Sequence, residues 1–204
     1  AQARLPSKYF LERSLDYDRR FEKIRRPRIL RGNFQSMRYF EAHADTICQN
    51  LHAGQAPASP MLGRLISQLP SEPWAAVHVR RGDYLNLPGH YVLLDAAYYR
   101  EAAMAISLPK EAPLVVIAER LEDAQEVVPG AAIYVDSTIL PDAGDVLRLF
   151  SRANFFIGAN STLSWWGTFL NQNPPNCKVL PARWFQRGNT TVMRSLVPSH
   201  WTTI

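Results

Sequence analysis

Apolar residues along this chain gather in short runs that alternate with longer, periodic stretches. Compact runs rich in Val, Ile and Ala, bounded by Pro, Gly or polar residues, predict buried strands. Such runs occupy residues 74–79, 114–118, 132–135, 154–158 and 177–180. Apolar residues at helical spacing lie between them and predict helices over residues 94–106, 122–128, 142–152 and 161–171.

The first 70 residues carry a different pattern. Residues 1–28 form a basic lead-in with little periodicity, which we interpret as partly helical. Residues 36–51 repeat apolar side chains near helical spacing and predict a helix, and residues 61–69 predict another that ends at Pro70. The stretch 53–60 is rich in Ala, Gly, Ser and Pro and predicts a loop between these two helices.

Alternating strands and helices beyond residue 73 place the chain in the α/β class with a parallel sheet. The right-handed crossover rule puts the loops after Val79, Ala118, Val135 and Gly158 at one edge of such a sheet. Ligands of open α/β sheets bind at the carboxyl ends of the strands. We therefore expect the functional residues in these loops.

Composition and charge limit the classes of protein that remain. The chain has 204 residues, 47% hydrophobic and 20% charged, which fits one large globular domain or two small ones. Its net charge of +5 is concentrated in residues 19–31, where Arg and Lys are opposed only by Glu22. A solvated basic face is the first interpretation of this cluster, and contact with an anionic lipid surface is the second. No nucleic-acid motif accompanies the cluster, so we predict no nucleic-acid partner.

Cysteine and histidine spacing predicts no metal. Cys48 and Cys177 are far apart, and the five histidines show no metal-ligand interval. Glycosylation acceptor patterns begin at Asn160 and Asn189, and we interpret the first as coincidental because it falls in a predicted ligand loop. Neither a secretory signal nor a membrane-spanning run is visible, which favours a bacterial cytoplasmic protein over one of the Golgi lumen.

The segment 78–84, with the sequence HVRRGDY, places Arg80 and Arg81 at the end of a predicted strand. An arginine presents a rigid fork of donors that matches two phosphate oxygens, so the pair predicts a phosphate-bearing ligand. Solvated arginines at a strand edge are the alternative. Asp83 could orient Arg80, orient His78 or act as a base, and orientation is the more frequent role of an acid beside arginines.

A second segment, residues 155–167, joins a predicted strand to a predicted helix. Ser161 or Thr162 is placed to cap that helix, and Asn160 and Ser164 flank the turn. Backbone N–H groups and the helix dipole make such a turn an anion site, although an ordinary capped helix would look the same. Trp165 and Trp166 are interpreted as core residues.

Glu119 follows the strand predicted over residues 114–118 and lies at the same edge. Its carboxylate could accept hydrogen bonds from a purine base, and a surface position in the following loop is the alternative. A nucleotide diphosphate held without metal needs fixed cations and helix-terminal N–H groups, which the two segments supply.

Four segments in order resemble the signature motifs of the α-1,2-fucosyltransferases of glycosyltransferase family 11. They are residues 78–84, residues 160–167 (NSTLSWWG), residues 30–40 (LRGNFQSMRYF) and residues 197–201 (VPSHW). The chain departs from the family in three places: a Gly-rich opening is absent, Glu119-Arg120 stands where two acids are usual, and Asn33 and Met37 replace Tyr and Glu.

The resemblance implies an inverting, metal-independent transfer of L-fucose from GDP-fucose to the 2-hydroxyl of a galactose-terminated glycan. It also implies a GT-B-like fold, with residues 1–70 as the remnant of an acceptor-side domain and residues 71–204 as a Rossmann-like GDP-fucose domain. By motif, Arg80 looks like the arginine that binds the β-phosphate, His78 like a guanosine contact, and Ser161 and Thr162 like phosphate contacts. Arg80 and Asp83 are the catalytic candidates. The GDP-fucose-binding candidates are His78, Arg80, Arg81, Glu119, Asn160, Ser161, Thr162 and Ser164.

The sequence is also compatible with two other functions. A fucosyltransferase of another linkage would share the His-x-Arg-Arg core, and a non-catalytic GDP-sugar-binding module would bind GDP without turnover. For location, we expect the cytoplasm or a peripheral position on the bacterial inner membrane, reached through the basic face of residues 19–31.

Overall fold

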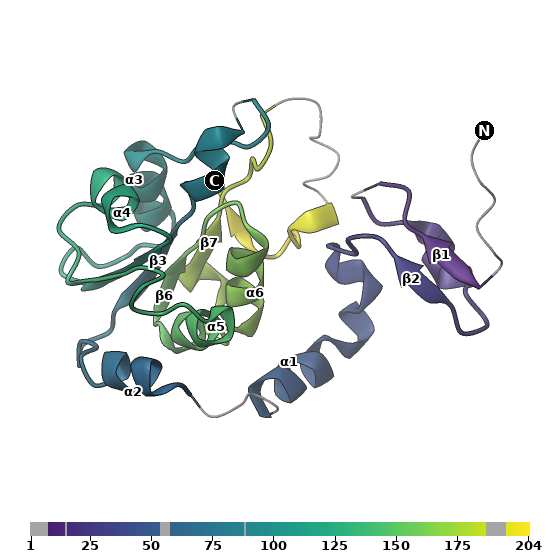
Figure 1. Cartoon of the computed structure of the whole chain (residues 1–204), viewed down its shortest axis with the longest axis horizontal. Helices are drawn as coiled ribbons and strands as arrows, with labels where there is room; N and C mark the ends of the chain where they lie inside the picture. Colours follow the sequence, from purple (N-terminus) through teal and green to yellow (C-terminus); the bar gives the residue numbers. More distant parts are fainter. Residues whose placement is uncertain (1–7, 15, 54–57, 88, 187–194) are drawn as a thin grey trace.

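The computed structural model describes residues 8–14, 16–53, 58–87, 89–186 and 195–204. Within these ranges the strands form a two-stranded sheet near the N-terminus and a six-stranded sheet in the rest of the chain. Figure 1 shows the two sheets at opposite sides of the view, with helix α1 (Ala44–Ala53) running between them.

Every pairing in the six-stranded sheet is parallel, and the strand order is β5-β4-β3-β6-β7-β8. Counted along the chain from β3, this is the order 3-2-1-4-5-6 of the Rossmann arrangement. The order reverses between β3 and β6, which are hydrogen-bonded neighbours. The strands are β3 (Ala75–Val79), β4 (Leu114–Ala118), β5 (Ile133–Val135), β6 (Phe155–Ile157), β7 (Lys178–Leu180) and β8 (Thr202–Thr203). The parallel α/β sheet predicted from the sequence is confirmed.

Helices cover both faces of this sheet. On one face, α3 (Ala96–Ala105) and α4 (Leu121–Val127) bury side chains such as Tyr99 and Val127 against Val77 and Val79. On the other face, α2 (Pro60–Ile66) and α5 (Ala143–Arg152) pack against Ala76 and Phe156. Helix α6 (Thr162–Leu170) lies beside α5 on this second face (Figure 1). Because successive strand residues point to opposite faces, His78 of β3 lies on the α5 side, where its ring is 5.3 Å from that of Phe150.

The helix predicted over residues 36–51 is only half right. Two short 3-10 turns, η2 (Met37–Tyr39) and η3 (Glu41–His43), precede α1, and Phe40 between them has a φ of −139°, which no α-helix contains. The apolar spacing continued across this break because Met37 and Phe40 pack on a cluster around Trp165 rather than along one helix face.

The N-terminal lead-in also differs from the prediction. Strand β1 (Tyr9–Leu11) pairs in parallel with β2 (Ile29–Arg31), and the connection between them contains one 3-10 turn, η1 (Arg19–Lys23). All three residues of β2 are exposed. Its sequence therefore lacks the longer apolar run, or the alternation of apolar and polar residues, from which a strand is predicted. Phe10, Phe21 and Phe34 form the small aromatic core of this N-terminal unit.

Helix α2 falls inside the unit predicted over residues 1–70, yet Leu62 and Leu65 are buried in the core of the six-stranded sheet. None of the helices in the described ranges is long and apolar enough to cross a membrane. The glycosylation pattern at Asn189 lies outside the described residues.

Candidate active site

A cavity of about 490 Å³ opens where the strand order of the six-stranded sheet reverses. We call it the switch-point cavity. Its walls come from the carboxyl ends of β3, β4 and β5, from the N-terminus of α5 and from the turn that begins α6. Its volume lies in the range of small-molecule sites. The polar residues that line it are His78, Arg80, Asp83, Tyr84, Tyr91, Glu119, Asp136, Ser137, Ser161 and Thr162.

His78 is buried on β3, with 4% of its surface exposed. Its Nδ1 lies 2.6 Å from Ser164 Oγ, which also accepts a hydrogen bond from the Ala159 N–H at 2.8 Å. Burial, with the charge of Arg80 as a smaller cause, lowers the pKa of His78 to about 3. The imidazole is therefore neutral at ordinary pH, and we assign its proton to Nε2 because the Ser164 hydroxyl has its proton free to donate to Nδ1.

Arg80 follows β3 directly and is fixed from three sides. Its Nη2 donates to Asp83 Oδ1 at 2.5 Å, and its Nη1 forms an ion pair with Glu119. The guanidinium also lies over the Tyr84 ring, 4.9 Å from the ring centre. The contact with Asp83 is the orienting one expected from the sequence. The arrangement presents one immobilised cation at the cavity wall.

Arg81 points away from this cavity although it is the neighbour of Arg80. Its Nη2 donates to Glu126 of α4 at 3.0 Å, and Arg81 is not among the residues that line the cavity. Arg81 is the N-cap of the 3-10 helix η4 (Gly82–Asn86), and the two neighbouring side chains reach different partners, Glu119 and Glu126. Phosphate binding by Arg81 remains a prediction without a geometric counterpart.

The turn that opens α6 has the capping geometry expected from its sequence. Ser161 is the N-cap, and its hydroxyl accepts a hydrogen bond from the Ser164 N–H at 3.1 Å. Ser161 and Thr162 line the cavity, so the N-terminus of a nine-residue helix faces the ligand space. This is the geometry in which backbone N–H groups and the helix dipole favour an anion.

Asn160 and Ser164 support this turn from behind. Asn160 is fully buried, and its Nδ2 donates to the carbonyl oxygens of Val92 and Trp184 at 2.9 and 3.0 Å. Ser164 is also fully buried, between His78 and the Ala159 N–H. Neither lines the cavity, so their predicted contact with a ligand has no counterpart in the geometry.

Two tyrosines of α3 tie the strand ends together. Tyr98 Oη donates to the Gly158 carbonyl at 2.6 Å, and Tyr99 Oη donates to the His78 carbonyl at 3.2 Å. These carbonyls lie at the ends of β6 and β3, the two strands that flank the reversal of strand order. Burial raises the pKa of both tyrosines, so both hydroxyls keep their protons.

Asp136 and Ser137 line the cavity after β5 but were not among the predicted site residues. Asp136 Oδ1 accepts hydrogen bonds from Thr138 and Ile139, and the Thr138 hydroxyl is the main cause that lowers the pKa of Asp136. The signal in the sequence was their place directly after a predicted strand at the ligand edge.

The two tryptophans of α6 pack as the sequence suggested. Trp165 is 4% exposed, and its indole N–H donates to the Leu196 carbonyl at 2.7 Å. Trp166 is partly buried and stacks on Phe40, with ring centres 5.9 Å apart and planes 9° apart. The two rings also contact each other, with ring centres 5.2 Å apart and planes at 79°.

The model of Glycosyl transferase family 11 matches residues 23–202. The chain belongs to this family. The match includes all four segments that carried the resemblance, from residues 30–40 to residues 197–201, and confirms the predicted membership of family 11.

This family 11 chain is also similar to the O-antigen biosynthesis glycosyltransferase WbnK of Escherichia coli. The two are 29% identical over 120 residues, which cover 56% of this chain and 40% of WbnK. The matched segment therefore spans less than half the length of that curated relative.

Proposed function

We propose that this family 11 glycosyltransferase transfers L-fucose from GDP-fucose to the 2-hydroxyl of a galactoside, with inversion and without a metal. One observation carries the proposal: Arg80 and the N-terminus of α6 line the same cavity at the reversal of strand order. A nucleoside diphosphate needs positive charge and N–H donors, and this cavity offers both from rigid elements.

The proposed roles follow from the positions of the side chains. A β-phosphate oxygen of GDP can replace a carboxylate oxygen on the Arg80 guanidinium, while Ser161 and Thr162 hold the other phosphate oxygens. Glu119 is exposed enough to turn from Arg80 to a purine N–H, since 46% of its side chain is accessible. The neutral His78 ring closes the floor of the cavity as a hydrogen-bond donor.

In the proposed reaction, the acceptor oxygen forms a bond to C1 of fucose while the bond from C1 to the β-phosphate oxygen breaks. GDP leaves with that electron pair, and Arg80 stabilises the negative charge that develops on it. The proton of the acceptor hydroxyl passes to a base. Asp83 is a candidate for the base, although its contact with Arg80 favours an orienting role.

Among the described residues, no group of three or more His, Cys, Asp or Glu side chains could hold a metal ion. We further propose the GT-B-like arrangement, with residues 1–70 on the acceptor side and residues 71–204 binding the donor. A cytoplasmic location with peripheral membrane contact through the basic face of residues 19–31 completes the proposal.

Calorimetric titration of the chain with GDP, GDP-fucose and ADP in the presence of EDTA tests the donor assignment. We expect GDP and GDP-fucose to bind and ADP to bind much more weakly. Failure of a folded sample to bind GDP would contradict the assignment. Incubation with GDP-fucose and a β-galactoside, followed by linkage analysis of the product, then separates α-1,2 transfer from another linkage and from binding without turnover.

A further inference from the structure

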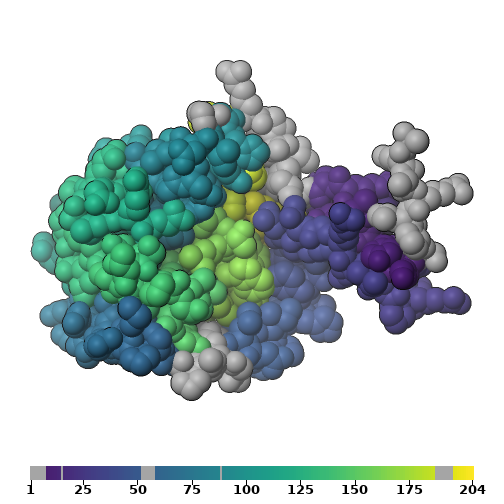
Figure 2. Space-filling model, viewed as in Figure 1, coloured from purple at the N-terminus to yellow at the C-terminus, as the bar shows by residue number. Residues whose placement is uncertain are grey.

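A second cavity, of about 140 Å³, lies between the N-terminal unit and α6. We call it the aromatic cavity, because the rings of Phe34, Phe40, Trp165, Trp166 and Trp184 form most of its wall. Figure 2 shows the blue N-terminal segment in contact with the green α6 region. The polar groups of its wall are the amides of Asn33 and Gln35 and the hydroxyl of Thr162.

Thr162 lines both the aromatic cavity and the switch-point cavity. Gln35 Nε2 also donates a hydrogen bond of 3.5 Å to Thr162 Oγ1, across 127 positions of sequence. The aromatic cavity is therefore next to the place where the diphosphate is proposed to bind. A group seated in it would lie beside the phosphate end of the donor.

The chemistry of the two walls differs. None of the described residues that line the aromatic cavity is charged, whereas Arg80 and three carboxylates line the switch-point cavity. An uncharged ligand with an apolar face and several hydroxyls suits aromatic rings combined with amides, since the rings take the C–H face and the amides both donate and accept hydrogen bonds. A pyranose sugar has this combination, and the small volume suits a single ring.

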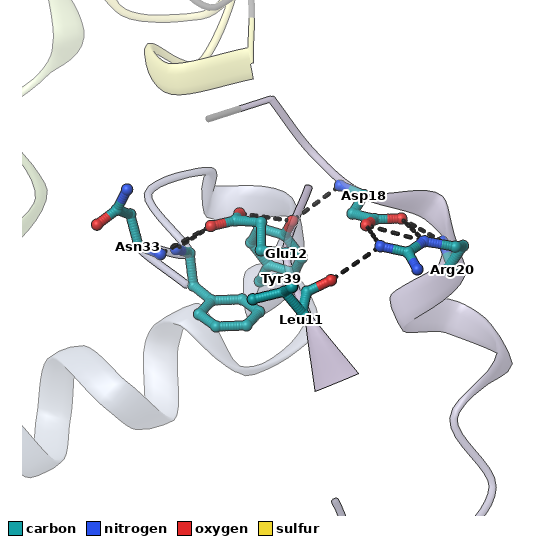
Figure 3. Close-up of polar contacts among 7 residues, drawn as sticks. Leu11, Glu12, Asp18, Arg20, Asn33 and Tyr39 are labelled. Carbon is teal, nitrogen blue, oxygen red and sulfur yellow. Dashed lines mark hydrogen bonds and ion pairs between the residues drawn. The ribbon is translucent and has the colours of Figure 1, made fainter. Parts of the chain in front are cut away.

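A buried carboxylate holds the loop that carries Asn33, Phe34 and Gln35 (Figure 3). Glu12 Oε2 accepts hydrogen bonds from the backbone N–H groups of Asn33 at 2.7 Å and Phe34 at 3.0 Å, and Glu12 Oε1 accepts from Tyr39 Oη at 2.8 Å. In Figure 3 the Asn33 side chain points away from Glu12, which leaves its amide free for another partner.

The backbone of this loop is held in a conformation that it would not adopt by itself. Phe34 has a φ of +46°, in the left-handed region that residues other than glycine seldom occupy. A Cβ at Gly32 would lie within 2.7 Å of Glu12 Oε2, so the approach of the carboxylate requires glycine there. The paired N–H groups on Glu12 compensate for this strain and fix where Asn33 and Gln35 present their amides.

We propose that the aromatic cavity is the subsite for the sugar ring of the acceptor, a neutral galactopyranoside, and that Glu12 is its positioning residue. This inference rests on the proposed function, because it assigns the second substrate of that reaction. Asn33 and Gln35 hydrogen-bond the ring hydroxyls, and the aromatic wall packs on its C–H face. Thr162 separates the acceptor ring from the donor diphosphate.

The test uses saturation-transfer NMR with methyl β-D-galactopyranoside on the whole chain in the presence of GDP, and calorimetry with GDP alone. We expect galactoside signals on the wild-type chain. The substitution Gln35→Ala should raise the galactoside Kd about tenfold, the scale of one lost hydrogen bond, with the GDP Kd unchanged. Gln125→Ala, at an exposed position of α4 that lines neither cavity, is the matched control and should change neither constant.

Glu12→Gln tests the positioning role. It should raise the galactoside Kd while the GDP Kd and the thermal unfolding midpoint of the six-stranded domain stay at the wild-type values. A variant that loses both ligands together would show a general structural role and would overturn the assignment of Glu12.

The other outcomes are decisive as well. A chain that binds GDP but gives no galactoside signal would overturn the acceptor subsite and leave the donor proposal standing. A chain that does not bind GDP would overturn both. If L-fucose replaces the galactoside in the NMR experiment and Gln35→Ala weakens GDP-fucose but not GDP, the aromatic cavity holds the donor sugar and the acceptor assignment is wrong.

Discussion

His78 Nδ1 and Ser164 Oγ lie 2.6 Å apart and join the end of β3 to the first turn of α6. The two residues are separated by 86 positions in sequence, and both are buried. The contact closes the floor of the switch-point cavity with a neutral pair. A charged imidazole there would lose the solvation of its charge, because the ring is buried.

This burial makes stability depend on pH in one direction. The unfolded chain takes up a proton at His78 below about pH 6.5, whereas the folded chain does so only near pH 3. Above pH 6.5 the ring is neutral in both states and does not change the free energy of unfolding. Below pH 6.5 its protonation in the unfolded chain lowers the free energy of unfolding by about 1.4 kcal/mol per pH unit. Urea unfolding of wild type and His78→Gln from pH 7 to pH 4 measures this, and parallel pH dependences of the two proteins would contradict it.

Arg80→Ala should reduce turnover by about 100-fold, the scale for removing one preorganised donor from developing negative charge. Arg81→Ala is the matched control, because its guanidinium contacts Glu126 and does not line the cavity. We expect a much smaller loss for the control. Initial rates with GDP-fucose and a β-galactoside measure both, and equal losses would show that the placement of the two arginines does not decide their roles.

Asp83→Asn separates orientation from base catalysis. Asp83 accepts a hydrogen bond from Arg80 at 2.5 Å, so the change should lower turnover roughly tenfold by loosening the guanidinium. The pH profile of kcat/KM should keep its shape, because no proton-transferring group is lost. Loss of the acidic limb in the variant would instead identify Asp83 as the base.

Tyr98→Phe removes the hydrogen bond to the Gly158 carbonyl and should cost about 1 kcal/mol of stability. It should also weaken GDP binding, since that carbonyl begins the turn that leads to Ser161 and Thr162. Tyr134→Phe removes a bond to the Val128 carbonyl and a bond from the Ala131 N–H, away from the switch-point cavity. Chemical denaturation should show a stability loss for both variants, at least as large for Tyr134→Phe, and calorimetry should show weaker GDP binding only for Tyr98→Phe.

Removal of divalent cations should leave transfer unchanged, because Arg80 and the α6 N-terminus are proposed to supply the charge that a metal would otherwise provide. Dialysis against EDTA followed by rate measurement, with Mg²⁺ and Mn²⁺ added back in parallel samples, is the direct experiment. Complete loss of activity in EDTA with recovery on addition of a metal would refute the metal-independent mechanism.

The six-stranded sheet was largely predictable because its strands are buried on both faces. The run at residues 114–118, for example, has four buried residues in succession, and such a run stands out in any sequence. Strands β2 and β8 escaped prediction for the opposite reason, since β2 is exposed throughout and β8 has only two residues. Strand β2 has two apolar residues, Ile29 and Leu30, and both are exposed, whereas β8 consists of two threonines.

For the site, the sequence predicted which loops meet but not where each side chain points. Strand ends and a capping serine are local features, and Arg80, Glu119 and Ser161, which follow such ends, all line the cavity. The direction of Arg81 depends on the 3-10 turn that follows it and on Glu126, 45 positions later. Its side-chain contact is tertiary, and local spacing carries no information about it.

The position of Thr162 limits how this protein can be altered. Because its side chain is a wall of both cavities, a substitution there changes two binding spaces at once, whereas Gln35 and Phe34 line only the aromatic one. Of the described residues that line the aromatic cavity, only Thr162 also lines the switch-point cavity, so substitutions at Asn33 or Gln35 can alter the first cavity without altering the lining of the second. A substitution of Thr162 should therefore change the binding of both proposed substrates together, whereas a substitution in the N-terminal loop should change only one.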